Sequence, residues 1–339
     1  ARKRELLRML RTTPHPRYRL SETPAELDAA DFAAAVAAGL SLPNKSLPCR
    51  FLYDARGSRL FEAICAVPEY YLTRAEHEIL VARAGAIAAR FDEPATLAEL
   101  GSGSARKTRL LIEAFLARHG ALRYVPIDIS RSALAASADS LLERYPGLEV
   151  HAIASEYHAG LRVLRAMAQG PKLVAWLGSN VGNFERSEAA GFLRRVRLAL
   201  AAGDRLLLGV DLRKPRAVLE AAYDDARGVT ARFTRNLLVR IDRELGGRFG
   251  PDSFAHRARW CEDEGKIEIH LVSRRKQRIA ITALGLEIEF ARDEAIHVED
   301  SFKYSPAEID ELLKAASFGC DERWLDAEGR FTLALCAPS

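Results

Sequence analysis

An alternation of apolar strand-like runs with helical runs through the middle of the chain most constrains its fold. Helices of this length between strands place successive strands parallel in one sheet, with helices over both faces. The sequence therefore predicts an α/β fold built on an open parallel sheet. The predicted strands are residues 95–100, 122–129, 148–155, 172–178 and 204–211, and the predicted helices between them are 105–119, 130–145 and 186–203.

The pattern changes after Asp211. Residues 215–241 predict one helix, and residues 266–290 alternate with period two around a basic turn, which predicts antiparallel strands. A closing hairpin is expected to turn at 326–329. Three further helices are predicted at residues 25–39, from Thr73 onward with Thr73 and Glu76 in capping-box register, and at 305–318.

Composition excludes several classes of protein. The 339 residues include 50 basic and 46 acidic side chains, so the charge is mixed and does not indicate nucleic-acid binding. No apolar run approaches the roughly 18 residues that a membrane helix needs. The basic amphipathic segment 1–10 is read as a surface helix and not as a secretory signal. Five scattered cysteines without a CxxC pair argue against a disulfide framework and a metal site, and they favour the cytoplasm.

The stretch "LAELGSGSARKTRLL" at 97–111 places two glycines between a strand and a helix, where a ligand touches backbone in open parallel sheets. A Walker phosphate loop and a dinucleotide fingerprint both require a glycine where this chain has Arg106. S-adenosylmethionine carries no phosphate and remains as the third ligand class. It needs a glycine turn and, after the next strand, an acid for the ribose hydroxyls.

Two acids stand at the required places. Asp128 lies at the end of the second strand and suits the ribose, and Glu156 follows the third and suits the adenine amino group. A helix N-cap turn with two surface acids is the alternative interpretation of the same residues.

The fourth strand ends in "WLGSNVGNF", which places Gly178, Gly182 and Asn183 beside the sulfonium. An asparagine oxygen or a tyrosine hydroxyl could hold a neutral amine for methylation, where positioning is the main requirement. Asn183 is equally well explained as a turn residue. Tyr70 and its neighbour Tyr71 suit interface packing as well as hydroxyl donation.

Five stretches together resemble one known family. They are "KSLPCRFLYDARGSRLFEAICAVPEYYLTRAEHEIL", "LAELGSGSARKTRLL", "WLGSNVGN", "AYDDARGVTARFTRNLL" and "VEDSFKY". In this order they resemble the histidine-specific, S-adenosylmethionine-dependent Nα-methyltransferases of ergothioneine biosynthesis. The resemblance runs from about Lys45 to the last residue.

The resemblance implies a Rossmann-like class I methyltransferase sheet with a second, smaller α+β substrate-binding domain. It assigns 75–212 and 304–339 to the first domain and 20–74 and 213–303 to the second. By the motif matches, S-adenosylmethionine contacts Gly101, Lys107, Asp128, Glu156 and Tyr157. The family commonly has Asp-Phe where this chain has Glu-Tyr, so binding is expected with an altered fit.

For the amino-acid substrate, the matched positions are Tyr53, Phe61, Tyr70, Gly178, Asn183, Tyr223, Phe233, Ile269, Glu299 and Ser301. Of these, the resemblance implies catalytic roles for Tyr70 and Asn183 at the amine. Glu299 and Ser301 are implied to bind the two nitrogens of a histidine imidazole. Ile269 stands where the family often has Met, so the substrate range could be wider. For Tyr223, a place in the core explains the residue equally well.

The resulting expectation is trimethylation of the α-amine of L-histidine to hercynine by a cytoplasmic monomer, without a metal, a membrane or a nucleic acid. One alternative is the same reaction on tryptophan or another aromatic amino acid. The other is a sensor that binds S-adenosylmethionine without transferring its methyl group. The co-occurrence of Tyr70, Asn183 and Glu299 argues against a sensor, because a sensor needs no substrate pocket.

Overall fold

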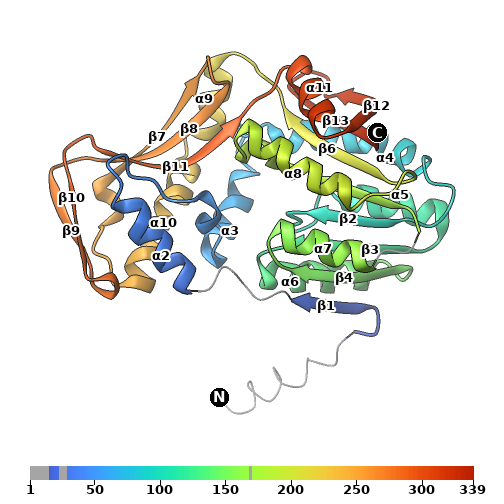
Figure 1. The fold of residues 1–339 in the computed structure, drawn as a ribbon, viewed down its shortest axis with the longest axis horizontal. Coiled ribbons are helices and arrows are strands. Elements are labelled where there is room, and N and C mark those ends of the chain that lie inside the picture. The colour runs from blue at the N-terminus through green and yellow to red at the C-terminus, as the bar shows by residue number, and fades with distance from the viewer. Residues whose placement is uncertain (1–14, 23–28, 168–169) are drawn as a thin grey trace, which may run out of the picture.

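The computed structural model describes residues 15–22, 29–167 and 170–339, which form two lobes (Figure 1). The predictions for residues 1–10 and for the start of the helix at 25–39 lie outside these ranges. The larger lobe holds an eight-stranded sheet in the order β1-β4-β3-β2-β5-β6-β13-β12. Its strands are β1 (Tyr18–Glu22), β2 (Thr96–Leu100), β3 (Leu122–Asp128), β4 (Leu148–Ala154), β5 (Lys172–Trp176), β6 (Arg205–Asp211), β12 (Phe318–Leu325) and β13 (Phe331–Pro338).

The strands from β1 to β6 in this sheet are parallel, and β13 joins β6 antiparallel. The five predicted strands and the closing hairpin are thus confirmed. Strand order reverses beside β2, because β3 follows on one side and β5 on the other. Ligands of open α/β sheets bind at this reversal, outside the carboxyl ends of the strands.

Alternate residues of β2 face two separate cores. Leu97 packs with one set of helices, and Ala98 packs with the other. The first set is α4 (Leu72–Ala88), α5 (Arg109–His119) and α6 (Arg131–Arg144), and the second is α7 (Tyr157–Met167), α8 (Arg186–Leu198) and α11 (Pro306–Ala315). Both faces of the sheet are covered, which explains its nearly continuous apolar strands. Helix α7 was not among the predicted helices.

The smaller lobe packs helices against antiparallel strands. Its three-stranded sheet has the order β11-β8-β7, and β9 pairs with β10. The elements of this lobe are α2 (Ala29–Leu40), η1 (Cys49–Leu52), α3 (Ala55–Ile64), α9 (Arg216–Tyr223), α10 (Val229–Leu245), η3 (Pro251–Ser253), β7 (Phe254–Cys261), β8 (Lys266–Ser273), β9 (Gln277–Ile281), η4 (Thr282–Leu284), β10 (Leu286–Phe290) and β11 (Ala295–Phe302).

Two predictions need correction here, and a third is confirmed. The single helix 215–241 is two helices, because Gly228 has φ +64° and Asp225 accepts bonds from the first amide groups of α10. The antiparallel strands predicted in 266–290 are confirmed, and β8 pairs with β7 and β11 while β9 pairs with β10. Residues 20–22, assigned to the smaller domain, belong to β1 of the large sheet.

Candidate functional site

The glycine turn and the first predicted acid lie together at the reversal of strand order. Gly101 and Gly103 both have positive φ, +72° and +48°, a conformation that glycine adopts without strain. The carboxylate of Asp128, at the end of β3, accepts bonds from the backbone N–H of Gly103 at 2.9 Å and of Ser130 at 2.8 Å. Burial raises the pKa of Asp128, although these N–H groups oppose the shift. A turn and an acid predicted from separate motifs are therefore in direct contact.

The next strand end brings two more predicted residues to the same edge. Glu156 lies two residues after the end of β4, and Tyr157 begins α7. A Cβ atom at Gly101 would stand 2.6 Å from the hydroxyl oxygen of Tyr157, so only glycine fits beside this tyrosine. Tyr157 also packs against the indole ring of Trp176.

Lys107 reaches the loop after β5 through a residue that the sequence did not assign to the site. Its ammonium pairs with Glu76, whose side chain is fully buried, and Glu76 also accepts from the backbone N–H of Gly178 at 2.7 Å. The capping box predicted for Thr73 and Glu76 is wrong, because the N-cap of α4 is Tyr71 and it makes no side-chain bond. Glu76 instead links the glycine turn to the β5 loop.

The charged side chains at this edge of the sheet fit S-adenosylmethionine. The ammonium of Lys107 suits its carboxylate, Asp128 suits the ribose hydroxyls and Glu156 suits the adenine amine. Open space lies beside Gly103, where a Cβ atom would meet nothing within 4 Å, so the backbone is accessible to a ligand. The contacts themselves remain predictions.

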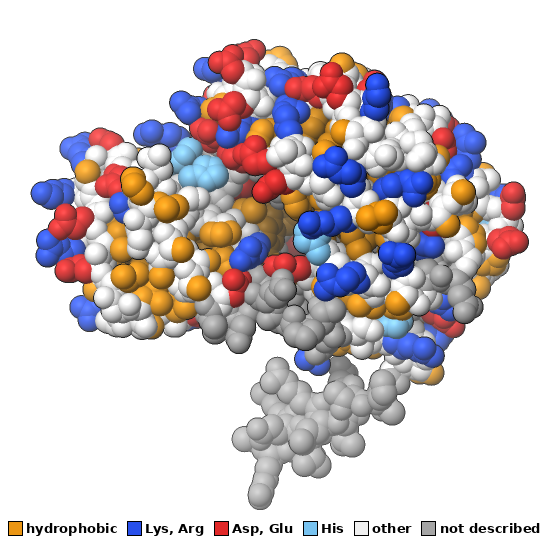
Figure 2. All heavy atoms as spheres, viewed as in Figure 1, with side chains coloured by type: hydrophobic (Ala, Val, Ile, Leu, Met, Phe, Trp, Pro, Cys, Tyr) orange, Lys and Arg blue, Asp and Glu red, His pale blue; other side chains and the backbone are white. Residues whose placement is uncertain are grey.

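A pocket next to this edge is lined by residues from both lobes. Figure 2 shows the surface hollowed between the lobes, with apolar side chains in the depth of the hollow. The structure brings together in this pocket all ten residues predicted for the substrate: Tyr53, Phe61, Tyr70, Gly178, Asn183, Tyr223, Phe233, Ile269, Glu299 and Ser301. Their roles in binding remain predictions. Five residues that were not predicted also line it: Ile64, Ser179, Asn180, Ala222 and Thr230.

Aromatic rings form much of the pocket wall. Tyr53 lies edge-on to Phe61 at 5.6 Å and to Phe233 at 5.4 Å between ring centroids, and Tyr70 lies edge-on to Tyr223 at 6.0 Å. Burial raises the pKa of each of these three tyrosines, so their hydroxyls stay protonated at neutral pH. The wall is therefore uncharged where rings face the cavity.

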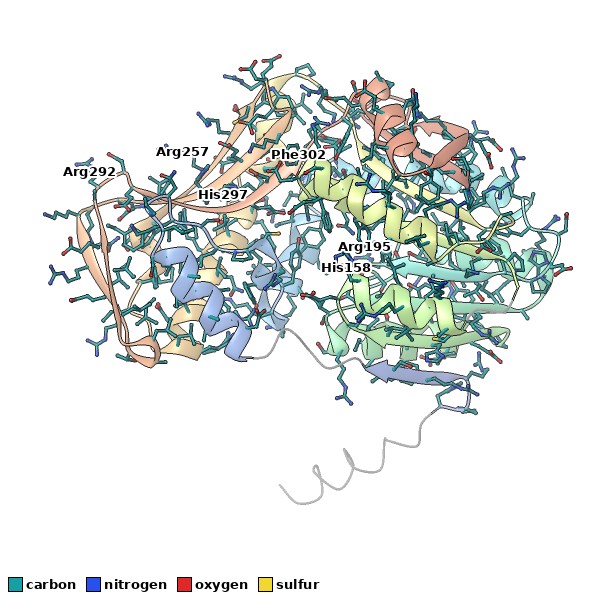
Figure 3. The ribbon with its side chains drawn as sticks, viewed as in Figure 1. His158, Arg195, Arg257, Arg292, His297 and Phe302 are labelled. Carbon is teal, nitrogen blue, oxygen red and sulfur yellow. The ribbon has the colours of Figure 1, made fainter. Side chains whose placement is uncertain are left out.

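Glu299 and Ser301 extend from one face of β11, two residues apart, as alternation in a strand requires. Figure 3 labels His297 and Phe302 on the same strand, on either side of this pair. Asp300 takes the opposite face, where it bonds His297 at 2.9 Å. Burial raises the pKa of Glu299 to about 7, although the positive charge of Lys303 acts to lower it. This carboxyl group consequently titrates near neutrality.

The β5 loop carries the other pocket residues. Asn183 ends η2 (Asn180–Asn183), which packs against β11. A Cβ atom at Gly182 would stand 2.6 Å from the carbonyl oxygen of Phe302, so this glycine allows the close approach of the two lobes. The sequence analysis predicted that Gly182 lies beside the sulfonium of the cofactor. The structure explains this glycine by its close packing against Phe302 of β11.

Beneath the pocket lies a buried charged cluster that the sequence did not predict. The carboxylate of Asp211, at the end of β6, pairs with Lys303 at 3.0 Å and with Lys214 at 2.7 Å, and it accepts a bond from the hydroxyl of Tyr71. Although burial raises the pKa of Asp211, the two ammonium groups hold it below its ordinary value. Lys303 stands in the quoted stretch "VEDSFKY", which was the one signal available for it.

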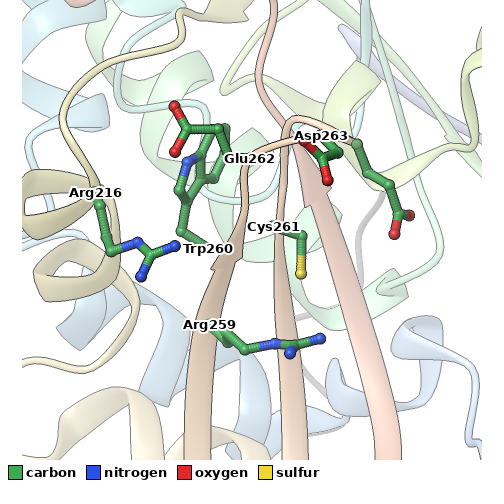
Figure 4. A pocket seen from close by; sticks show the side chains of 7 residues that line it. Arg216, Arg259, Trp260, Cys261, Glu262 and Asp263 are labelled. Atoms are coloured by element: carbon green, nitrogen blue, oxygen red, sulfur yellow. The ribbon is translucent and has the colours of Figure 1, made fainter.

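A second pocket lies at the turn between β7 and β8 (Figure 4). Its lining mixes opposite charges with one indole ring: Arg216, Arg259, Trp260, Cys261, Glu262, Asp263 and Glu264. None of the predicted site residues lines it. The described part of the chain holds no group of three His, Cys, Asp or Glu side chains that could bind a metal, and no helix there could cross a membrane.

Comparison with known proteins identifies close relatives. The histidine N-alpha-methyltransferase of Mycobacterium tuberculosis is 41% identical over 304 residues, which span 89% of this chain and 93% of that protein. Ergothioneine biosynthesis protein 1 of Schizosaccharomyces pombe is 29% identical across 82% of this chain and 37% of its own length. An L-tryptophan methyltransferase of Psilocybe serbica is also 29% identical, across 88% of this chain and 91% of that protein.

The family described as "Histidine-specific methyltransferase, SAM-dependent" matches residues 32–338, a range that includes every strand of both lobes except β1. With this match, the chain belongs to the histidine-specific, S-adenosylmethionine-dependent methyltransferases.

Proposed function

We propose that this protein transfers three methyl groups in turn to the α-amine of L-histidine and so forms hercynine, a step of ergothioneine biosynthesis. The observation that carries the proposal is the single pocket in which ten residues from five separated parts of the chain meet. Glu299 and Ser301 at one end suit the two nitrogens of an imidazole ring. Family membership and the relative at 41% identity point to the same substrate.

The two lobes would bind different ligands. The strand ends of the large sheet would hold S-adenosylmethionine through Gly101, Lys107, Asp128, Glu156 and Tyr157, and the smaller lobe would supply most of the substrate wall. When bound, the cofactor supplies an electrophilic methyl group. We propose that residues 75–212 and 304–339 form the cofactor-binding domain, which β1 joins. Residues 20–74 and 213–303, apart from β1, would form the substrate-binding domain.

The residues of the chain would position the amine and keep water away. Asn183 and Tyr70 would orient the neutral amine, whose proton leaves to solvent before each transfer. Neutral groups suit this role because a carboxylate would retain the ammonium form. The aromatic wall also suits the quaternary ammonium that the third transfer creates, since rings attract such cations.

The proposed function is tested by incubating the protein with S-adenosylmethionine and each of the twenty amino acids, with products read by mass spectrometry. We expect a mass gain of three methyl groups on histidine alone. Trimethylated tryptophan at higher efficiency would favour the alternative substrate. Cofactor binding without any methylated product would favour a sensor.

Asn183→Ala is expected to lower turnover on histidine by roughly ten- to a hundredfold, because the amine loses an oriented acceptor worth about 1–3 kcal/mol. Affinity for S-adenosylmethionine should stay near that of the wild type. Steady-state kinetics and calorimetry on one preparation measure both. If Asn183 serves only the turn, turnover per folded molecule will be normal and the melting temperature will fall.

The affinity for histidine is expected to fall as the pH drops through about 7. Glu299 accepts an imidazole N–H more strongly when ionised than when protonated, and its raised pKa of about 7 makes the ionised fraction fall about tenfold between pH 8 and 6. Glu299→Gln is the control, because the histidine ligand titrates identically in both proteins. Calorimetric titrations at these two pH values should show that the wild type loses more affinity for histidine than Glu299→Gln does. An equal loss of affinity in the two proteins would contradict the prediction.

A further inference from the structure

Lys303 lies behind the wall of the substrate pocket and bonds two of the side chains that form it. The side chain is fully buried. Its ammonium donates to the hydroxyl oxygen of Tyr223 at 2.7 Å and to Oγ of Ser301 at 2.8 Å, and it pairs with Asp211 at 3.0 Å. All three of its hydrogens are thus used. Burial lowers the pKa of Lys303, but the charge of Asp211, the nearby Tyr223 and the hydrogen bonds to both together raise it above its ordinary value, so the group stays cationic.

The two hydroxyl groups that Lys303 bonds also bond each other. The oxygens of Tyr223 and Ser301 are 2.9 Å apart. Each hydroxyl has one hydrogen, and an ammonium can only donate. One hydroxyl hydrogen is therefore used between the two oxygens and the other is left for the pocket. Both oxygens already accept a bond from the cation and one also accepts from the other hydroxyl, so one hydrogen and one lone pair remain. The positive charge of Lys303 behind the pair favours the hydrogen, so the hydroxyl pair faces a ligand as a hydrogen donor.

We propose that Lys303 is a positioning residue that fixes the Tyr223–Ser301 pair as a donor and thereby selects a substrate ring with an acceptor nitrogen. This inference rests on the proposed function. Imidazole has one N–H and one acceptor nitrogen, whereas indole has an N–H and no acceptor. Glu299 can accept from either ring. Only imidazole also satisfies the donor, and a buried donor left unpaired penalises the wrong ring.

The chain supplies a matched control for Lys303. Lys214 pairs with the same carboxylate of Asp211, its side chain is 6% exposed, and it bonds the backbone oxygen of Leu212. Lys214 does not line the pocket, and no bond joins it to Tyr223 or Ser301 among the described contacts. Lys303→Met and Lys214→Met each remove one ammonium from Asp211, but only the first releases the hydroxyl pair.

The test compares L-histidine with β-(pyrrol-3-yl)-L-alanine, whose ring has the size of imidazole and an N–H but no acceptor nitrogen. The ratio of kcat/KM for histidine to that for the pyrrole is measured at saturating S-adenosylmethionine. We expect Lys303→Met to lower this ratio about tenfold, mainly through the KM for histidine, and Lys214→Met to leave it unchanged. An unchanged ratio in Lys303→Met, or an equal fall in both variants, would overturn the proposal.

A second variant keeps the test decisive if Lys303→Met does not fold. The double substitution Ser301→Ala with Tyr223→Phe removes both hydroxyls and leaves both lysines paired with Asp211. This double variant should lower the histidine-to-pyrrole ratio of kcat/KM as much as Lys303→Met does. A ratio equal to that of the wild type would overturn the proposal. Calorimetric binding of the two ligands separates this inference from the proposed function. If the wild type binds histidine better than the pyrrole without methylating it, the proposed function fails and the inference stands; equal affinities overturn the inference.

Discussion

Asp128→Ala is expected to weaken binding of S-adenosylmethionine more than a hundredfold. Two ribose hydroxyls would each lose a charged acceptor, and such hydrogen bonds contribute roughly 1.5–3 kcal/mol each. The substitution also removes the acceptor for the N–H groups of Gly103 and Ser130, so the glycine turn is held less firmly. Calorimetric titration of the folded variant with the cofactor gives the dissociation constant.

Asp128→Asn serves as the control for this prediction. Its amide oxygen still accepts from Gly103 but carries no charge, so we expect an intermediate loss of affinity. Thermal unfolding without ligand shows how far each variant destabilises the turn. An unchanged dissociation constant for Asp128→Ala would remove Asp128 from the cofactor site, and the predicted ligand of the turn would have to be reconsidered.

The large sheet could be predicted because its signals are local. Each buried strand is a short apolar run between helix-length segments, and the glycine turn stands directly after one of them. Pairing in the smaller lobe could not be predicted in the same way. Period-two alternation in 266–290 identifies strands, but it does not reveal that β8 pairs with β7 and β11 while the next strand, β9, pairs with β10.

The site residues show the same limit at the level of side chains. Asp128 and Glu156 could be predicted as cofactor contacts because S-adenosylmethionine needs acids at the ends of the strands that follow the glycine turn, and the sequence has a carboxylate at each of these places. Glu76 and Asp211 look like ordinary charges of a helix and a strand end, and only the fold shows that both are fully buried. Their partners, Lys107 and Lys303, are distant in sequence, so no spacing indicated these pairs.

Glu299→Ala is expected to lower kcat/KM for histidine about ten- to a hundredfold, because a buried imidazole N–H loses its acceptor at a cost on the order of 1–3 kcal/mol. The shorter side chain also opens space beside Ile269, its neighbour across the strands, into which a second ring could extend. Tryptophan should therefore be penalised less. The ratio of the histidine efficiency to the tryptophan efficiency should therefore fall.

The volume and the charge of Glu299 can be separated with Glu299→Gln. Glutamine keeps the length of the side chain and an acceptor oxygen, so tryptophan should gain nothing and the ratio should fall much less than in Glu299→Ala. Both variants are compared with the wild type at pH 8, where most of the wild-type carboxyl is ionised. If the ratio is unchanged in Glu299→Ala, Glu299 does not read the side chain. Selection of histidine would then rest on the Tyr223–Ser301 pair and on the fit of the aromatic wall.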